Sequence, residues 1–260
     1  MAARAMWKAV LQFEGKSLPV KFYSAVQAQG VHFRLLHASD NVPVSQHMVD
    51  AETGDDVPRE SVQKGYAMEK GLYVVLKPRD LAKTEPAASR DVAISTFLPN
   101  HAIAAPWFHR PYYLGPDGAE DAYFALVTAL AETQTMGLAH WVMRKRNYHG
   151  AVISHAGVLM VITLRTADEV LAVGDLKIDN EKALDAKEIK LAEQLISALQ
   201  GPFEPETYRD EYRERVMKLV QSKAEGKATP PVRAKPKHSP TSLEAALRSS
   251  VKAAKENKVA

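Results

Sequence analysis

The sequence has no cysteine among its 260 residues. Disulfides, zinc–thiolate sites and cysteine nucleophiles are therefore excluded. Long apolar runs are also missing, since the longest, Val158–Leu164, is far shorter than the roughly 20 residues that cross a bilayer. Residues 1–13 contain some apolar side chains, but Glu14, Gly15 and Lys16 interrupt them too soon for a signal peptide. We expect a cytoplasmic protein without a membrane segment.

Motifs of catalysis are missing as well. The sequence contains no glycine-rich phosphate loop and no G-x-S-x-G nucleophile elbow. The nine histidines are dispersed, and the set closest to a cluster, His140, His149 and His155, is better explained by chance than by a metal site. Acidic neighbours such as Asp55 and Asp56 point apart on either a strand or a helix. We therefore expect no catalytic residue, no metal and no cofactor.

The composition is that of a globular protein, with 46% hydrophobic and 25% charged residues. The net charge of +3 hides an asymmetry. Residues 222–260 hold nine lysines and arginines against three glutamates, which leaves the rest of the chain mildly acidic. A basic tail of this kind either meets a polyanion or is simply a solvated end, and charge alone does not separate these two interpretations.

The first two-thirds of the chain reads mainly as strands. Alternating or continuous apolar segments predict about seven of them, namely Trp7–Phe13, 18–23, 31–36, 73–76, 92–96, 138–143 and Val158–Leu164. The last is apolar almost throughout, so we expect it to be buried on both faces. The irregular spacing of the strands favours a barrel over a β-α-β array. Residues 41–65 form a polar stretch so long that it indicates a functional or disordered loop.

Three helices are predicted after this loop. Asp117 has the capping-box spacing to Glu120, and Asp185 has it to Glu188. Thr207 is a candidate cap for a third helix, after which the globular body ends near residue 221. Residues 222–240 are rich in Ala, Lys and Pro and read as a linker.

A short amphipathic helix is predicted to follow this linker. Thr241 and Glu244 form a further capping box. One face of the helix carries Leu243, Ala246, Leu247, Val251 and Ala254. This face either binds a partner or belongs to a marginal helix that frays in water.

One basic cluster lies directly after the expected strand 138–143. It consists of Arg144, Lys145 and Arg146. Three consecutive cations in a mildly acidic body can contact phosphates, although an ordinary solvated strand end carries the same residues.

Several segments, in order, carry a resemblance to a known family. They are residues 6–8, 18–25, 31–37, 52–54, 62–66, 71–76, 110–116, 129–133, 208–213 and 243–250. Together these segments resemble the bacterial Ku family over about residues 6–221 and the terminal segment. The chain departs from the family pattern locally, at Ala67-Met68 and at Gln134-Thr135-Met136.

The resemblance implies a mainly β fold with appended helices: a Ku-like β-barrel, a DNA-encircling loop at 41–65, C-terminal dimerisation helices and a flexible basic tail. The core domain would cover residues 1–221, and the tail residues 222–260. The implied function is sequence-independent binding of double-stranded DNA ends by a ring-shaped, nucleoid-associated homodimer. It would protect the ends and recruit the ATP-dependent DNA ligase of end joining, ligase D. The rivals are a barrel-based nuclease, which needs clustered carboxylates, and a single-strand or RNA-binding barrel, which needs aromatic platforms.

The resemblance also assigns site residues. The expected DNA contacts are Arg144, Lys145, Arg146, Arg34, Arg59 and Lys64. The tail adds Lys223, Lys227, Arg233, Lys235 and Lys237. The expected partner-binding face is Leu243, Ala246, Leu247 and Val251. One observation opposes these assignments, because the loop 41–65 carries five carboxylates against two cations.

Overall fold

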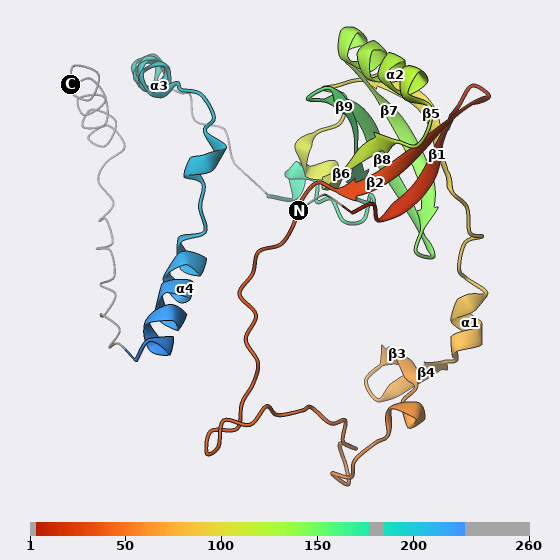
Figure 1. Ribbon diagram of the computed structural model, residues 1–260, viewed down its shortest axis with the longest axis vertical. Helices are drawn as coiled ribbons and strands as arrows, with labels where there is room; N and C mark the ends of the chain where they lie inside the picture. Colours follow the sequence, from red (N-terminus) through yellow and green to blue (C-terminus); the bar gives the residue numbers. More distant parts are fainter. Residues whose placement is uncertain (1–3, 177–184, 227–260) are drawn as a thin grey trace. The chain divides into compact units, whose positions relative to one another are not determined.

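The computed structural model describes residues 4–176 and 185–226 (Figure 1). The chain divides into two compact units. One consists of Met1–Gln29 and Arg34–Asp175, and the other of Gly30–Phe33 and Leu176–Ala260.

The first unit contains a closed barrel whose strands are hydrogen-bonded in the order β1-β2-β6-β9-β8-β7-β5. Their bounds are β1 Trp7–Phe13, β2 Lys16–Ser24, β5 Asp91–Pro99, β6 Phe108–Pro116, β7 Thr135–Met143, β8 Arg146–His155 and β9 Val158–Leu164. Neighbours are antiparallel except β1 and β5, whose parallel pairing from Val10↔Asp91 to Gln12↔Ala93 closes the barrel. The expected mainly β barrel is therefore confirmed.

The barrel core comes from side chains that alternate along these strands, as the pleat requires. It includes Leu11, Leu18, Val20, Phe22, Val92, Leu114, Trp141, Val152, Leu159 and Val161. The expectation for β9 is wrong in one respect: Leu159, Val161 and Thr163 are buried, but the residues between them are only half-buried. Closing the barrel leaves no unpaired edge strand, but one face of every strand still points away from the core. The residues on that outward face of β9 are therefore only half-buried.

Helix α2, Glu120–Thr133, lies against the barrel (Figure 1). Its Tyr123 is fully buried, and the hydroxyl donates to the Leu114 carbonyl at 2.5 Å and accepts from the Leu159 N–H at 2.9 Å. The predicted capping role of Asp117 is wrong, because Ala119 is the N-cap residue. Asp117 instead forms ion pairs with Lys8 of β1 and Lys21 of β2.

A long excursion, residues 25–90, leaves the barrel after β2 and returns at β5. We call residues 25–60 its outgoing limb and residues 61–90 its return limb. It contains η1 Arg59–Ser61, β3 Lys64–Glu69, β4 Leu72–Leu76 and α1 Pro78–Ala82. Strands β3 and β4 form a separate antiparallel sheet.

The strand predicted at 31–36 is wrong. Leu36 makes one isolated bridge to Pro43, while Phe33 and Leu35 remain 67% and 64% exposed. Alternation alone does not make a strand where no neighbouring strand supplies a ladder.

The second unit contains α3 Ala186–Leu199, η4 Pro205–Thr207 and α4 Glu211–Ala224. Asp185 caps α3 as predicted, accepting from Lys187 N at 2.8 Å. The cap of α4 is Asp210 rather than Thr207, because Asp210 accepts from Arg213 N at 2.9 Å while Thr207 ends η4. The short helix η3, Val173–Leu176, spans the boundary between the two units, and the helix expected from Thr241 lies outside the described residues. Within the described ranges, no helix is both long and apolar enough to cross a bilayer.

Candidate nucleic-acid interface

The basic cluster forms the tip of the β7–β8 hairpin. Met143 pairs with Arg146, so Arg144 and Lys145 are the central residues of a two-residue turn. Both have positive φ, 49° and 65°, as in a type I′ turn. The other two-residue hairpin turns of the barrel have glycine second, Gly15 and Gly157. The β7–β8 turn therefore holds two cations in a conformation that side chains disfavour.

All three residues of the cluster are exposed. Lys145 Nζ lies 2.8 Å and 3.1 Å from the two carboxylate oxygens of Glu85. Within residues 4–176 and 185–226, Arg144 and Arg146 make no ion pair. The turn thus presents two uncompensated guanidinium groups beside one paired ammonium group.

A cleft of about 930 Å³ is lined by Lys145 of this turn and by residues 60–85, mostly of the return limb. Its lining includes the cations Lys64, Lys77, Arg79 and Lys145, the carboxylates Glu60 and Glu85, and apolar residues among them Leu76 and Leu81. Two of the predicted site residues, Lys64 and Lys145, are therefore brought together although they lie on different parts of the chain.

The other predicted contacts do not join this cleft. Arg59 lines a separate hollow of about 420 Å³ with His47 and Asp56, which lie 3.7 Å apart. Arg34 is exposed on the outgoing limb. In the tail, Lys223 lies in the last turn of α4, whereas Lys227, Arg233, Lys235, Lys237 and the face Leu243, Ala246, Leu247 and Val251 lie outside the described residues.

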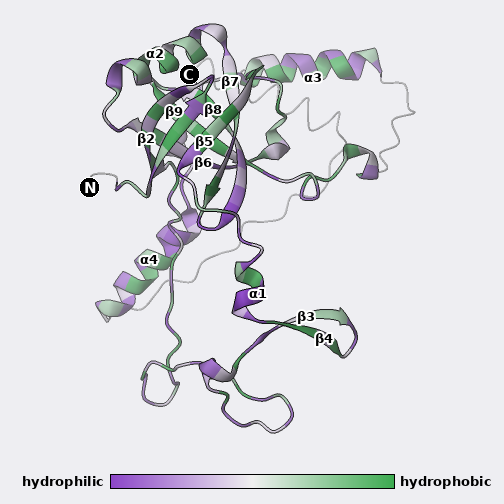
Figure 2. Cartoon of the chain, turned by 90° about the vertical axis from the view of Figure 1, so that its right-hand side faces the viewer, coloured by the Kyte–Doolittle hydropathy of each residue, from purple (hydrophilic) through white to green (hydrophobic). Residues whose placement is uncertain are grey.

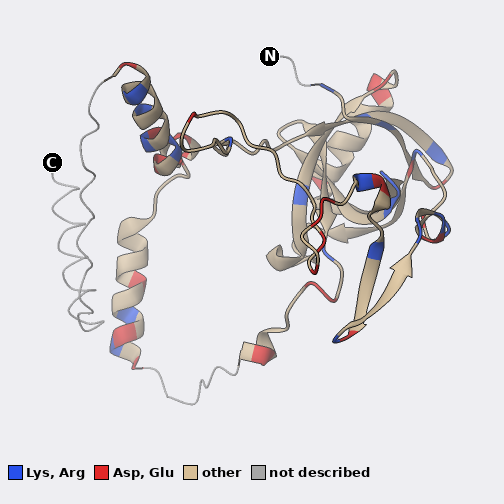
Figure 3. Cartoon of the chain, turned by 90° about the horizontal axis from the view of Figure 1, so that it is seen from below, with Lys and Arg blue, Asp and Glu red and all other residues tan. Residues whose placement is uncertain are grey.

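Sequence reasoning missed two cations of the cleft, Lys77 and Arg79, which flank Pro78 at the start of α1. Counting charges separately in the two limbs of the excursion would have pointed to them. The outgoing limb carries six carboxylates against two cations, whereas the return limb carries six cations against three carboxylates. The outgoing limb therefore has the net negative charge that opposed a DNA-binding loop, and the return limb is net positive. Figure 3 colours the charged residues along the chain.

A comparison with protein families matches residues 12–192 to the Ku70/Ku80 beta-barrel domain. A "Non-homologous end joining protein Ku 2" of Geotalea uraniireducens (strain Rf4) is 36% identical over 226 residues, covering 87% of this chain and 88% of that protein. A "Non-homologous end joining protein Ku" of Anaeromyxobacter sp. (strain K) is 36% identical over 256 residues, covering 97% and 86%. The chain belongs to the Ku family.

The Ku match covers the barrel from Gln12 onward, the excursion and the β7–β8 turn, so the cleft lies wholly within the matched region. A second hollow, of about 600 Å³, lies over β5, β7 and β8 and is lined by His140 and His149, which are partners in the strand register. In the part of the chain that the structure describes, no three histidine or carboxylate side chains are grouped to hold a metal ion.

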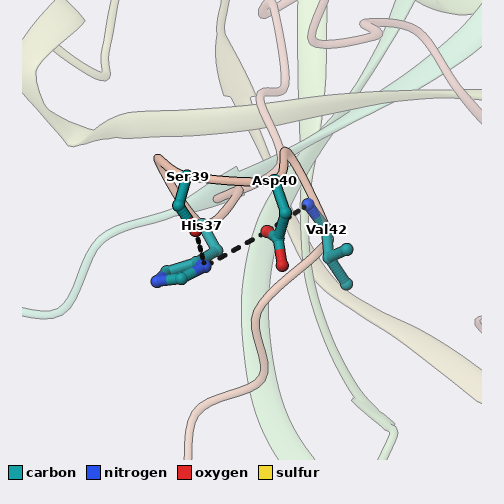
Figure 4. Close-up of polar contacts among 4 residues, drawn as sticks. All are labelled: His37, Ser39, Asp40 and Val42. Carbon is teal, nitrogen blue, oxygen red and sulfur yellow. Dashed lines mark hydrogen bonds and ion pairs between the residues drawn. The ribbon is translucent and has the colours of Figure 1, made fainter.

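One group on the outgoing limb of this Ku chain superficially resembles a catalytic triad (Figure 4). His37 Nδ1 lies 2.9 Å from Ser39 Oγ and 3.1 Å from Asp40 Oδ1. A triad needs the serine on one ring nitrogen and the carboxylate on the other, so that a proton can pass through the ring. Here both partners share Nδ1, and Asp40 also accepts from Val42 N at 3.1 Å. The group therefore stabilises a tight turn.

The aromatic residues in and just before β6 pack within or beside the barrel. Tyr112 is buried and packs near Phe22, and Trp107 and Phe108 are half-buried. Tyr113 is 38% exposed but stacks on His155, with ring centroids 6.4 Å apart. These four residues therefore have packing partners in or beside the barrel.

Proposed function

We propose that this Ku family member binds the ends of double-stranded DNA without regard to sequence, as a ring-shaped homodimer, and that it recruits the ATP-dependent ligase D in double-strand break repair. The observation that carries the DNA-binding step is the exposed Arg144–Lys145–Arg146 turn beside a cleft whose other cations come from the return limb. The names of the relatives, which place them in non-homologous end joining, support the repair role.

The chemistry of the turn fits phosphates rather than bases. Guanidinium and ammonium groups on a hairpin tip can neutralise backbone phosphates, and such contacts position a protein on a duplex without reading its sequence. Binding should weaken steeply with salt, since each neutralised phosphate releases condensed counterions.

End preference follows from encirclement. If the excursions of two chains close around the duplex, an uninterrupted circle offers no entry and a terminus does. The preference for ends then arises from topology, and no group of the protein needs to recognise the terminus chemically.

We propose that a second copy covers apolar residues that the single chain leaves exposed. Figure 2 colours the chain by hydropathy. On the β3–β4 sheet, Tyr66, Met68, Leu72 and Tyr73 are each 58% exposed or more. An isolated two-stranded sheet is marginal in water and gains stability when such faces are covered. On α3, Ile189, Ile196 and Leu199 are exposed as well. We assign both elements to the dimer.

We propose no catalytic step for this chain. Its role would be that of a scaffold, and the ligase would supply the chemistry. The segment assigned to ligase contact, residues 241–260, is proposed from the family resemblance. Deleting it should abolish stimulation of the ligase and leave end binding intact, and unchanged stimulation would overturn the assignment.

One binding experiment tests the central proposal. Linear duplex, sealed circular duplex free of nicks and single strands are compared at equal salt. We expect binding to linear duplex alone, and equal binding to sealed circles would overturn encirclement.

The site is tested by replacing Arg144, Lys145 and Arg146 with alanine. Affinity should fall, and the slope of log K against log salt should flatten by about 0.9 for each lost phosphate contact. Unchanged affinity and slope would exclude the turn from the interface.

A further inference from the structure

The Lys145–Glu85 pair joins two parts of the first unit that are distant in the sequence. Lys145 is at the tip of the β7–β8 hairpin, and Glu85 is on the return limb between α1 and β5. Among the described residues, this is the one ion pair that connects the excursion to the barrel. It therefore ties the return limb to the turn that we assign to phosphate contact.

The same contact compensates the charge of Lys145. Both Glu85 oxygens lie within 3.1 Å of Nζ, so a phosphate that approaches Lys145 also meets a carboxylate. Arg144 and Arg146, which flank it, carry no such partner in the described part of the chain. The three cations of the turn are therefore not equivalent before DNA arrives.

The pair is weak enough to be exchanged. The side chain of Lys145 is 72% exposed and that of Glu85 33% exposed. Exposed ion pairs contribute little net stability, because water and salt screen them and two side chains lose freedom. A phosphate held at the same time by neighbouring arginines can thus replace the carboxylate.

We propose that Glu85 is a masking residue: it neutralises Lys145 in the free protein, and a DNA phosphate displaces it, which detaches the return limb from the β7–β8 turn. This inference rests on the proposed function. The inference adds that the two events are coupled at Lys145: a DNA phosphate takes the place of the Glu85 carboxylate, and the return limb is released.

The first test is the full-length Glu85→Gln variant, measured on linear duplex over a range of salt. We expect binding to tighten about two- to fivefold near 50 mM salt, the range that an exposed pair supplies. The gain should shrink as salt rises, because salt screens the pair in the wild type. Unchanged or weaker binding overturns the proposal. If Glu85 merely oriented Lys145 for DNA, removing its charge would lower the affinity for DNA.

The matched control is Glu60→Gln, which removes the same charge from the lining of the same cleft but from a residue without an ion pair in the described ranges. Masking predicts a larger gain for Glu85→Gln than for Glu60→Gln. It also predicts that the excess disappears in a Lys145→Gln background. Equal gains, or an excess that persists without Lys145, would mean a general charge effect and overturn the proposal.

A second readout follows the contact itself. Zero-length carbodiimide cross-linking should join Lys145 to Glu85 in the free protein and fail once DNA saturates it. The pair of Lys21 and Asp117, 2.7 Å apart on the barrel, serves as the internal control and should cross-link in both states. Persistence of the Lys145–Glu85 product on DNA, or its absence from the free protein, overturns the proposal.

Failure of the masking idea is distinguishable from failure of the proposed function. Wild-type end binding, and its loss in an Arg144→Ala/Arg146→Ala variant, depend on the proposed function alone. If both are observed while Glu85→Gln behaves like Glu60→Gln, only the masking step is wrong. If neither is observed, both ideas fall.

Discussion

Arg144 and Lys145 are adjacent residues that both occupy the left-handed region, with φ of 49° and 65°. Asparagine followed by glycine is the preferred pair for such a turn, and side chains held at positive φ cost about 1 kcal/mol or more each. The chain thus keeps two cations where the fold alone would favour other residues. This conflict between conformation and charge is typical of a functional position.

The conflict predicts opposite effects on stability and binding. Replacing Arg144 with Asn and Lys145 with Gly should raise the free energy of unfolding by about 1 kcal/mol, since the new residues suit the turn. The same change should weaken binding to DNA ends. Urea unfolding and a binding titration measure the two effects.

A matched control for this prediction is Ala156→Asn, which creates the same Asn-Gly turn at Ala156 and Gly157 of the β8–β9 hairpin. It should stabilise slightly and leave DNA binding unchanged. A turn variant that bound DNA normally would contradict the role of the cations, whatever its stability.

The Tyr123 hydroxyl predicts a stability effect without a functional one. Tyr123→Phe leaves the buried Leu159 N–H and the Leu114 carbonyl without this partner. Unsatisfied buried groups of this kind cost about 1–3 kcal/mol, so the urea midpoint should fall. Burial also raises the pKa of this phenol, which keeps it protonated as a donor. The exposed Tyr113→Phe change is the control, and an equal loss there would argue against the hydrogen bonds.

Gly150 is the point where β8 passes closest to the core. A Cβ at this position would lie 2.6 Å from the Trp141 ring and 2.8 Å from the Ile162 carbonyl oxygen. Because the carbonyl belongs to the β9 backbone, it cannot move aside as a flexible side chain would. Gly150→Ala should therefore destabilise the barrel by about 1–3 kcal/mol in thermal or urea unfolding. Gly30→Ala, which meets nothing within 4 Å, should be nearly neutral.

The sequence predicts much of the barrel but not every strand. Apolar segments of strand length predict β1, β2, β5, β7 and β9 of the barrel, and also β4 of the separate sheet. β6 was missed because Pro111 interrupts it, although that proline sits at a bulge where its lack of an N–H is tolerated. β8 was missed because its first residues are polar and exposed. The register that closes β1 onto β5 depends on tertiary contacts and has no local signal.

The residues alone pointed to the site only where its cations are consecutive, and Lys64 was added by the family resemblance. The run of three cations pointed to Lys145, whereas its partner Glu85 is 60 residues away. Nothing local to either residue specifies the pair. Lys77 and Arg79 were missed because the predicted loop, 41–65, ends before them. That range also combines most of the acidic outgoing limb with the start of the basic return limb, so its net charge hides the basic part.

Asp117 gives a prediction for pH. Its oxygens lie 2.7 Å from Lys21 Nζ and 2.9 Å from Lys8 Nζ, and these contacts, with Lys21 first, lower the pKa of the carboxyl group. A carboxyl group with a lowered pKa stabilises the fold above its unfolded pKa of about 3.9, and the contribution is lost as the pH falls through the folded value. The difference in unfolding free energy between wild type and Asp117→Asn should therefore be full at neutral pH and vanish in acid.

Lys21 sets the upper end of the pH range over which its pair with Asp117 stabilises the fold. Its hydrogen bond to Asp117 raises its pKa, so the contribution is present below the unfolded value of about 10.4 and is lost as the pH rises through the folded one. Urea unfolding at several pH values should thus show a plateau between two declines. In a Lys21→Gln background both declines should shrink without vanishing, because Lys8 still pairs with Asp117. If Asp117→Asn cost as much well below the folded pKa of this carboxyl group as at pH 7, the side chain would act through packing, because a protonated carboxyl group has no charge to lose.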